Sequence, residues 1–135
     1  MTDADPQPRP LWLIDGNNVM GSAADGWWND PAAAAARLAE RIGRWARGQE
    51  AYVVVVFDGA PDEGISAAAG GNLEVLHARR KGRDAADDRI VEEVEARYGA
   101  HPETIVATSD RGLIGRLPPG VHTEGGGRFL RRLPG

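Results

Sequence analysis

AYVVVVF, residues Ala51 to Phe57, is an apolar run whose central four residues are all valine. A continuous β-branched stretch without polar alternation is typical of a strand buried on both faces, as found in parallel sheets covered by helices. Residues 11–14 and 104–108 form two more apolar runs, and residues 72–77 and 121–123 are weaker strand candidates. These runs together predict a largely parallel sheet.

Helices are expected between the strands. The first should span residues 30–47, because Asp30 provides an N-cap and Pro31 occupies the first helical position. The second should span residues 83–98, and shorter helices are expected after residue 110 and at residues 128–133. The alternation of strands and helices predicts one α/β domain, with a mainly parallel sheet flanked by helices. We assign residues 1–10 to a flexible N-terminal arm and residues 11–135 to the domain.

Composition restricts the class of protein. The 135 residues suffice for one domain with a single core. The absence of cysteine excludes a disulfide framework, a zinc knuckle and a thiol nucleophile, and it fits a reducing cytoplasm. No apolar stretch approaches the roughly 20 residues of a membrane span, and residues 1–10 lack the pattern of a signal peptide. We therefore expect a cytoplasmic protein with no membrane association.

Three apolar strand candidates end in the same way, at Asp15, Asp58 and Asp110. In an open α/β sheet, ligand sites lie outside the carboxyl ends of the strands, so these three carboxylates should converge in one crevice. Carboxylates so close repel one another unless a cation or shared protons intervene. An oxygen-rich cluster with neither cysteine nor histidine suits a hard cation such as Mg²⁺ or Mn²⁺.

The helix expected from residue 83 adds a fourth carboxylate. At about 100° per residue, Ile90, Val91, Val94 and Tyr98 form one stripe that should face the sheet. Asp87 lies near the middle of that stripe, Asp84 at its edge, and Asp88 toward solvent. A carboxylate on a buried helix face is unusual unless something offsets its desolvation, so Asp87 is the residue we assign to the site.

Each aspartate also has a purely structural interpretation. Asp15, Asp58 and Asp110 are suited to turns at strand ends, and Asp84 with Asp87 resembles a pair that caps a helix. The site interpretation rests on the joint pattern, with several carboxylates at one edge of the sheet and one on a buried helix face.

Four motifs, in this order, resemble the NYN domain, in particular its YacP-like branch, within the PIN-like ribonuclease group. They are LIDGNNV at residues 13–19, VFDG at 56–59, DAADD at 84–88 and ATSD at 107–110. The resemblance extends from about Leu11 to Leu133 and implies a Rossmann-like three-layer domain that hydrolyses RNA with the help of Mg²⁺ or Mn²⁺. It assigns metal binding to Asp15, Asp87 and Asp110, a further acidic role to Asp58, and orientation of the site to Asn18.

A dense basic run precedes the helix that carries Asp87, and it comprises Arg79, Arg80, Lys81 and Arg83. A basic loop beside a metal site is suited to gripping backbone phosphates, and Arg111 extends the patch. The alternative is an ordinary solvated loop. The net charge of −4 argues modestly against a nucleic-acid partner, although cations bound to the carboxylates would offset part of it.

Two other functions stay open on the sequence. One is a non-catalytic RNA-binding or interaction module of the same fold. The other is a Mg²⁺-dependent phosphatase, although aspartyl phosphatases usually carry two aspartates two residues apart, and here Asp15 is followed by Gly16 and Asn17. A P-loop enzyme is excluded because no glycine-rich loop ends in Gly-Lys-Ser/Thr. Single-stranded RNA is the expected partner. Action on a ribosome, action with another RNA-processing partner, and formation of a homodimer all stay open on the sequence.

Overall fold

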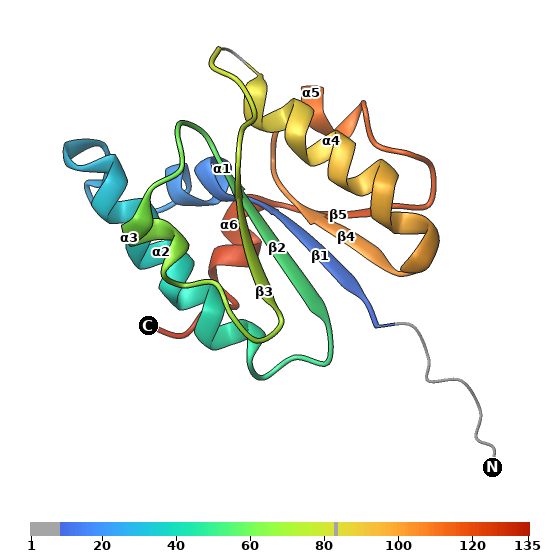
Figure 1. The fold of residues 1–135 in the computed structure, drawn as a ribbon, viewed down its shortest axis with the longest axis horizontal. Helices are drawn as coiled ribbons and strands as arrows, with labels where there is room; N and C mark the ends of the chain where they lie inside the picture. The colour runs from blue at the N-terminus through green and yellow to red at the C-terminus, as the bar shows by residue number, and fades with distance from the viewer. Residues whose placement is uncertain (1–8, 83) are drawn as a thin grey trace.

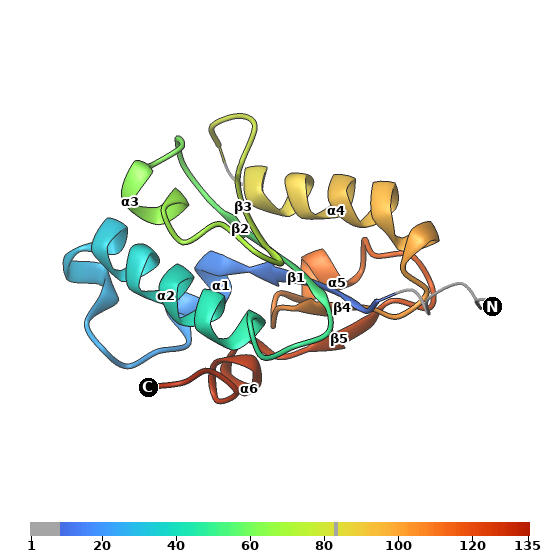
Figure 2. The same cartoon turned by 60° about the horizontal axis from the view of Figure 1, so that its bottom comes forward.

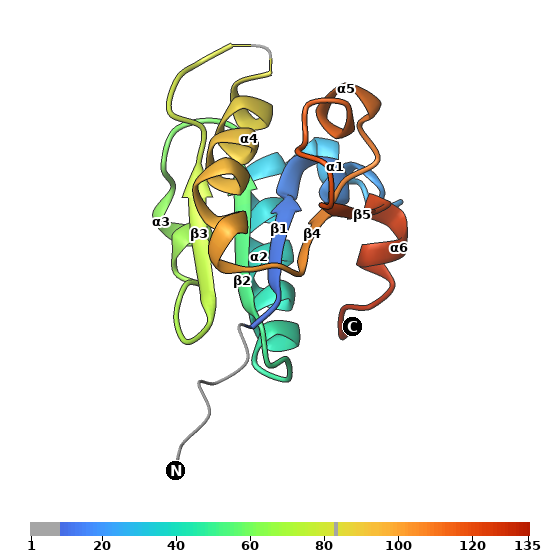
Figure 3. The same ribbon diagram turned by 90° about the vertical axis from the view of Figure 1, so that its right-hand side faces the viewer.

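The computed structural model describes residues 9–82 and 84–135, so the N-terminal arm assigned to residues 1–10 lies almost entirely outside the described residues. Five strands form one sheet in the order β3-β2-β1-β4-β5, and every neighbouring pair is parallel. The strands are β1 (Leu11–Asp15), β2 (Tyr52–Phe57), β3 (Leu73–His77), β4 (Thr104–Ala107) and β5 (His122–Glu124). Figure 3 shows them in this order, from β3 on the left to β5 on the right. The prediction of an α/β domain with a mainly parallel sheet is confirmed.

Helices cover both faces of the sheet, giving three layers (Figures 1 and 2). One face carries α1 (Gly16–Gly21), α2 (Pro31–Ala46), α3 (Glu63–Ser66) and α6 (Gly126–Leu130). The other carries α4 (Ala85–Arg97) and α5 (Arg111–Ile114). Two short 3₁₀ helices, η1 (Trp27–Asn29) and η2 (Tyr98–Ala100), follow α1 and α4.

Each face of the sheet has its own hydrophobic core, because successive side chains of a strand point to opposite faces. Leu13 and Val54 pack with Ile90 of α4 in one core, whereas Ile14 and Val55 belong to the core that α2 covers. All of these side chains are fully buried. Burial on both sides explains why the strands lack polar alternation.

Three local predictions were wrong. The segment after β1, interpreted as a polar loop, is the helix α1, which Asp15 caps at its N-terminus. The last helix begins earlier than expected, at Gly126, because the glycines that precede Phe129 are part of it. Tyr98 is not part of the core beneath α4 and is 41% exposed, because the chain leaves the α-helical path after Arg97 and continues as η2.

The register of the strands places the functional segments at one edge. Asp15 is level with Val56, and Ile14 is level with Ala107, so β1, β2 and β4 end side by side. The residues that follow these strands are therefore neighbours in space. Within residues 9–82 and 84–135, no helix is long and apolar enough to cross a membrane.

Candidate metal-binding active site

An open cavity of about 310 Å³ lies at the carboxyl edge of the sheet. We call it the acidic cavity. Its polar lining consists of seven side chains: Asp15, Asn17, Asn18, Asp58, Asp84, Asp87 and Asp110. The structure therefore brings together all four predicted aspartates and Asn18, and it adds Asn17 and Asp84, which the sequence interpretation left outside the site.

Asp15 is the most deeply buried carboxylate of the cavity, with 4% of its surface exposed. It ends β1 and caps α1, and its Oδ1 accepts a hydrogen bond of 3.4 Å from the Asn18 N–H. The Thr108 hydroxyl donates to Oδ2 at 2.9 Å. The same hydroxyl oxygen accepts the N–H of Asp110 at 3.1 Å. Thr108 thus ties the end of β1 to the start of α5 and fixes the Asp15 carboxylate.

Two asparagines at the start of α1 hold the neighbouring loops. Asn18 Oδ1 accepts the Ser109 N–H at 2.8 Å, and Asn17 Oδ1 accepts the Asp58 N–H at 2.7 Å. Asn18 therefore holds Ser109, the residue directly before Asp110. Asn17 does the same for Asp58, and its signal in the sequence was its place beside Asn18 in the same motif.

Two glycines permit the close packing around these asparagines. A β-carbon on Gly16 would lie 2.6 Å from Cε1 of Phe57, and one on Gly126 would lie 2.6 Å from Oδ1 of Asn18. With contacts that short a neighbouring group must move, so a β-carbon at either position would disturb the packing around the asparagines. The glycine-rich segment before Phe129 is therefore part of the support of the site.

Asp110 caps a helix and also borders the acidic cavity. Its Oδ1 caps α5 by accepting the N–H groups of Gly112 at 2.8 Å and Leu113 at 3.1 Å. The residue also lines the acidic cavity. Capping holds the carboxylate in place, so the structural role and the site role are compatible.

The start of α4 presents Asp84 and Asp87 to the cavity. Asp84 has a left-handed backbone, with φ of 64°, and its side chain makes no capping hydrogen bond. A non-glycine residue in this region carries about 1 to 2 kcal/mol of strain, although aspartate tolerates it better than most residues. Asp88 does not line the cavity and pairs instead with Arg80 and Arg116. The Asp88 carboxylate is thus paired with two arginine side chains rather than simply solvated.

Mutual proximity and burial change the acidity of the cluster. Burial raises the pKa of Asp15 to about 6, the Thr108 and Asn18 hydrogen bonds oppose that rise, and the charges of Asp87 and Asp110 add to it. Burial, followed by the charges of Asp110 and Asp84, raises the pKa of Asp87. Burial also raises the pKa of Asp58. Each of these carboxylates is less stable as an anion here than in water, which is the condition that a bound cation relieves.

The donor set suits a hard divalent cation, because it contains only carboxylate and amide oxygens. Among residues 9–82 and 84–135, no three acidic or histidine side chains lie close enough together to hold an ion as they stand. The carboxylates thus line a common cavity without converging on a single point. Small rotations of side chains at the open end of the cavity would be needed to complete a coordination shell.

The basic residues before α4 lie in an exposed loop at the same end of the molecule. Arg79 lies 3.8 Å from both Glu92 and Glu93, and Arg80 pairs with Asp88. Lys81 and Arg111 are exposed. Arg83, the remaining basic candidate, lies outside the described residues.

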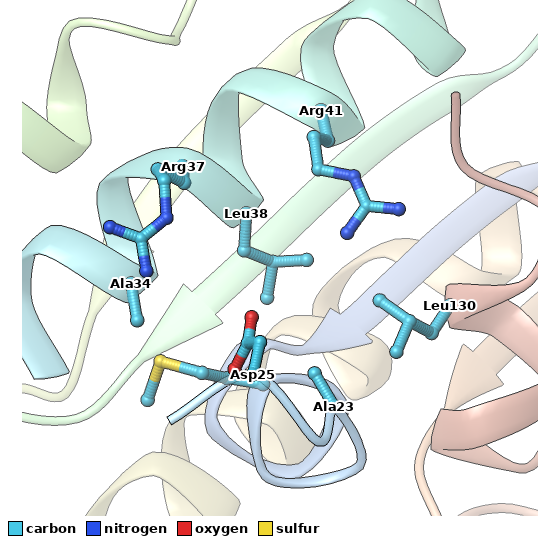
Figure 4. Close-up of a pocket in the computed structure, with 8 residues that line it drawn as sticks. Ala23, Asp25, Ala34, Arg37, Leu38, Arg41 and Leu130 are labelled. Atoms are coloured by element: carbon cyan, nitrogen blue, oxygen red, sulfur yellow. The ribbon is translucent and has the colours of Figure 1, made fainter. Parts of the chain in front are cut away.

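A smaller cavity, of about 90 Å³, is separate from the acidic cavity and shares no lining residue with it. It lies between α2, the segment after α1, and α6. Figure 4 shows Leu38 pointing from α2 toward Asp25, with Leu130 contributed by α6. Its volume corresponds to roughly three water molecules, which is too small for a nucleotide.

Comparison with known proteins identifies the family. A model described as the YacP-like NYN domain matches residues 12–114. A search among curated proteins gave no match. The structure of a tryptophan-to-leucine mutant of Rae1 (YacP) from Bacillus subtilis has a TM-score of 0.68 and 24% identity, covering 90% of this chain and 73% of that chain. A second structure of Rae1 (YacP) from Bacillus subtilis has a TM-score of 0.67 and 24% identity, covering 90% of this chain and 71% of that one.

At this identity the two crystal structures establish the shared fold. The family match is stronger evidence, because it spans most of the chain and includes Asp15, Asp58, Asp87 and Asp110. The protein belongs to the YacP-like NYN domain family, a family of PIN-like nucleases.

Proposed function

We propose that this protein is a metal-dependent ribonuclease whose active site is the acidic cavity. The observation that carries the proposal is that Asp15, Asp58, Asp87 and Asp110 all line one cavity at the carboxyl edge of the sheet. Membership of a nuclease family supports the reaction class. Single-stranded RNA is the proposed substrate, and the cytoplasm the proposed location.

Asp15, Asp87 and Asp110 are the proposed ligands of Mg²⁺ or Mn²⁺. Such an ion, when bound, would neutralise the phosphate and lower the pKa of a water molecule that attacks phosphorus. The buried Asp15 carboxylate, fixed by Thr108, provides the least mobile ligand. Asp87 and Asp110 lie where α4 and α5 begin, and these two helices cover one face of the sheet. The helix α1, which follows Asp15, lies on the other face.

The remaining polar residues position the ligands and the substrate. Asn18 holds the segment that carries Asp110, and Asn17 holds Asp58 at the rim. No serine or cysteine nucleophile is required, because the attacking group is water. The proposed contacts to backbone phosphates, other than the phosphate that is cleaved, are Arg79, Arg80, Lys81, Arg83 and Arg111.

Cleavage of a labelled single-stranded RNA tests the proposal directly. The wild-type protein is compared with Asp87→Asn in the presence of Mn²⁺ or Mg²⁺, and with EDTA added. Glu95→Gln is the matched control, because Glu95 is an exposed carboxylate of the same helix and does not line the cavity. We expect cleavage by wild type and Glu95→Gln, and none by Asp87→Asn or with EDTA.

Three results would contradict the proposal. Salt-sensitive RNA binding without cleavage would identify a non-catalytic binding module. Hydrolysis of a small phosphomonoester with no cleavage of RNA would identify a phosphatase. Cleavage that survives both EDTA and Asp87→Asn would show that neither a divalent ion nor the acidic cavity is responsible for it.

A further inference from the structure

A second cavity adjoins the acidic one. It has a volume of about 210 Å³ and lies between the start of α2, the end of β2 and α3. Asn17 and Asp58 line both cavities, so the two are direct neighbours that share these residues. We call the second one the apolar cavity, because aliphatic and aromatic side chains form most of its wall.

We propose that the apolar cavity receives one nucleobase of the RNA, next to the phosphodiester that occupies the acidic cavity. The inference rests on the proposed function and adds to it a site that selects the base beside the cut. Backbone phosphates position a nucleic acid, whereas contacts to bases specify its sequence. Single-stranded RNA is well suited to such recognition, since its unstacked bases can enter protein pockets.

The walls of the cavity fit a flat, uncharged ring. Pro31 and Ala32, in the first turn of α2, are exposed on one side, and Ala60, in the loop after β2, is exposed nearby. Ile65 and Phe57 are buried and close the interior. A concave site with apolar walls and a few convergent polar groups is the usual form of a small-ligand pocket.

Size and charge narrow the choice of occupant. The volume corresponds to roughly seven water molecules, enough for a heterocyclic ring, whereas the cavity beside Arg37 holds roughly three. The charged groups at the apolar cavity are Asp58 and Asp62, which repel phosphate. A neutral base therefore fits where a second phosphate does not.

Asp62 provides a fixed hydrogen-bond acceptor. Its Oδ1 caps α3 by accepting the N–H groups of Gly64 at 2.8 Å and Ile65 at 3.2 Å. Oδ2 accepts none of the hydrogen bonds recorded among the described residues. A carboxylate in this position accepts from an exocyclic amino group, as aspartate does from N4 of cytosine. Cytosine, adenine and guanine carry an exocyclic NH₂ group, whereas the base edge of uracil offers only its ring N3–H, so the cavity should favour the three amino-bearing bases.

Asn17 provides the complementary donor. Because its Oδ1 accepts the Asp58 N–H, its side-chain NH₂ is the part left for a ligand. The cavity floor is also closely packed, since a β-carbon on Gly16 would lie 2.6 Å from the Phe57 ring. A preformed pocket loses less affinity to ordering than a flexible one.

Nucleoside binding tests the cavity without relying on cleavage or metal. The ¹⁵N-labelled protein is titrated with adenosine, cytidine, guanosine and uridine, and the amide shifts of Gly64 and Ile65 are followed. Ala32→Phe should fill the cavity from an exposed helix position. Ala96→Phe is the control, because Ala96 is an exposed alanine of α4 and does not line the cavity.

We expect saturable shifts with at least one amino-bearing nucleoside and binding of uridine weaker by about tenfold. Ala32→Phe should abolish the shifts, and Ala96→Phe should retain them. Asp62→Asn keeps an oxygen to cap α3 but gains an N–H donor, so it should remove the discrimination against uridine. Thermal melting of each variant establishes that it is folded.

RNA substrates with a single abasic site separate the two proposals. If the base enters the cavity, one abasic position beside the cut should raise KM about tenfold in wild type and have no effect in Ala32→Phe. Nucleoside binding without any RNA cleavage would support the base pocket and contradict the nuclease. The absence of saturable nucleoside shifts, or equal shifts in Ala32→Phe, would overturn the base pocket even if RNA is cut.

Discussion

Asn18 and Ser109 are joined by a hydrogen bond of 2.8 Å, in which the backbone N–H of Ser109 donates to the side-chain oxygen of Asn18. The two residues are 91 positions apart, and they lie just after the ends of the neighbouring strands β1 and β4. The bond fixes the segment from which Asp110 enters the acidic cavity. Asn18 thus acts on the site through the main chain.

Asn18→Ala should weaken the site without unfolding the protein. Loss of the bond frees Ser109 and, with it, the position of Asp110. Removing a residue that orients metal ligands typically lowers metal affinity or activity 10- to 100-fold. The measurement is the Mn²⁺ concentration that gives half-maximal RNA cleavage. Asn29→Ala, at an exposed residue that lines neither cavity, should match wild type.

Gly126→Ala should reproduce the Asn18 defect by pushing on the same side chain. The new β-carbon would lie 2.6 Å from Asn18 Oδ1 and 3.1 Å from Ser22 Oγ. Overpacking of this kind lowers the free energy of unfolding by about 1 to 3 kcal/mol. Gly127→Ala is the neighbouring control, since its β-carbon meets nothing closer than 3.9 Å. Equal cleavage rates for the two variants would argue against the packing role of Gly126.

Asp15→Asn should abolish cleavage and yet stabilise the metal-free protein near pH 8. The pKa of Asp15 rises from 3.8 to about 6 on folding, because burial disfavours the anion. The folded state therefore binds this proton more tightly than the unfolded state, and stability falls as pH rises from about 4 to 6. At 1.36 kcal/mol per pKa unit, the full effect above pH 6 is roughly 3 kcal/mol.

Thermal melting in EDTA measures how far the Asp15 carboxylate lowers the stability of the metal-free protein. Asp15→Asn should melt higher than wild type near pH 8, and the difference should nearly vanish near pH 4, where Asp15 is protonated. Addition of Mn²⁺ should raise the melting temperature of wild type alone. A variant that is less stable than wild type at both pH values would show that Asp15 is not held as an unfavourable anion.

Lys81→Ala should reduce RNA affinity without changing the choice of cleavage site. A lysine that contacts phosphate contributes to binding of any RNA sequence. Its loss lowers the slope of log Kd against log salt concentration by about one, because about one counterion fewer is released on binding. The measurement is the slope of log Kd against log salt concentration for single-stranded RNA. Arg47→Ala, at the opposite end of the sheet after α2, should leave the slope unchanged.

The class of fold, and four of the five aspartates that line the acidic cavity, could be predicted from the sequence. Valine-rich strands without alternation are recognisable locally, and parallel strands necessarily end at a common edge. These two facts sufficed to predict that Asp15, Asp58 and Asp110 lie in one cavity. Helical periodicity added Asp87, because its place on the buried stripe of α4 depends only on spacing along the chain.

The tertiary structure decided what surrounds those carboxylates. Thr108 contacts Asp15, which is 93 positions away in the sequence, and Asn17 contacts Asp58, which is 41 positions away. Over such separations a local sequence pattern does not show which residues will be neighbours in space. The left-handed backbone at Asp84 and the start of α1 directly after Asp15 depend on how the loops pack. The apolar cavity exists only because α2 and α3 meet beside the end of β2. Local propensity predicts the strands and helices, but the shape and acidity of a site depend on contacts between residues far apart in the chain.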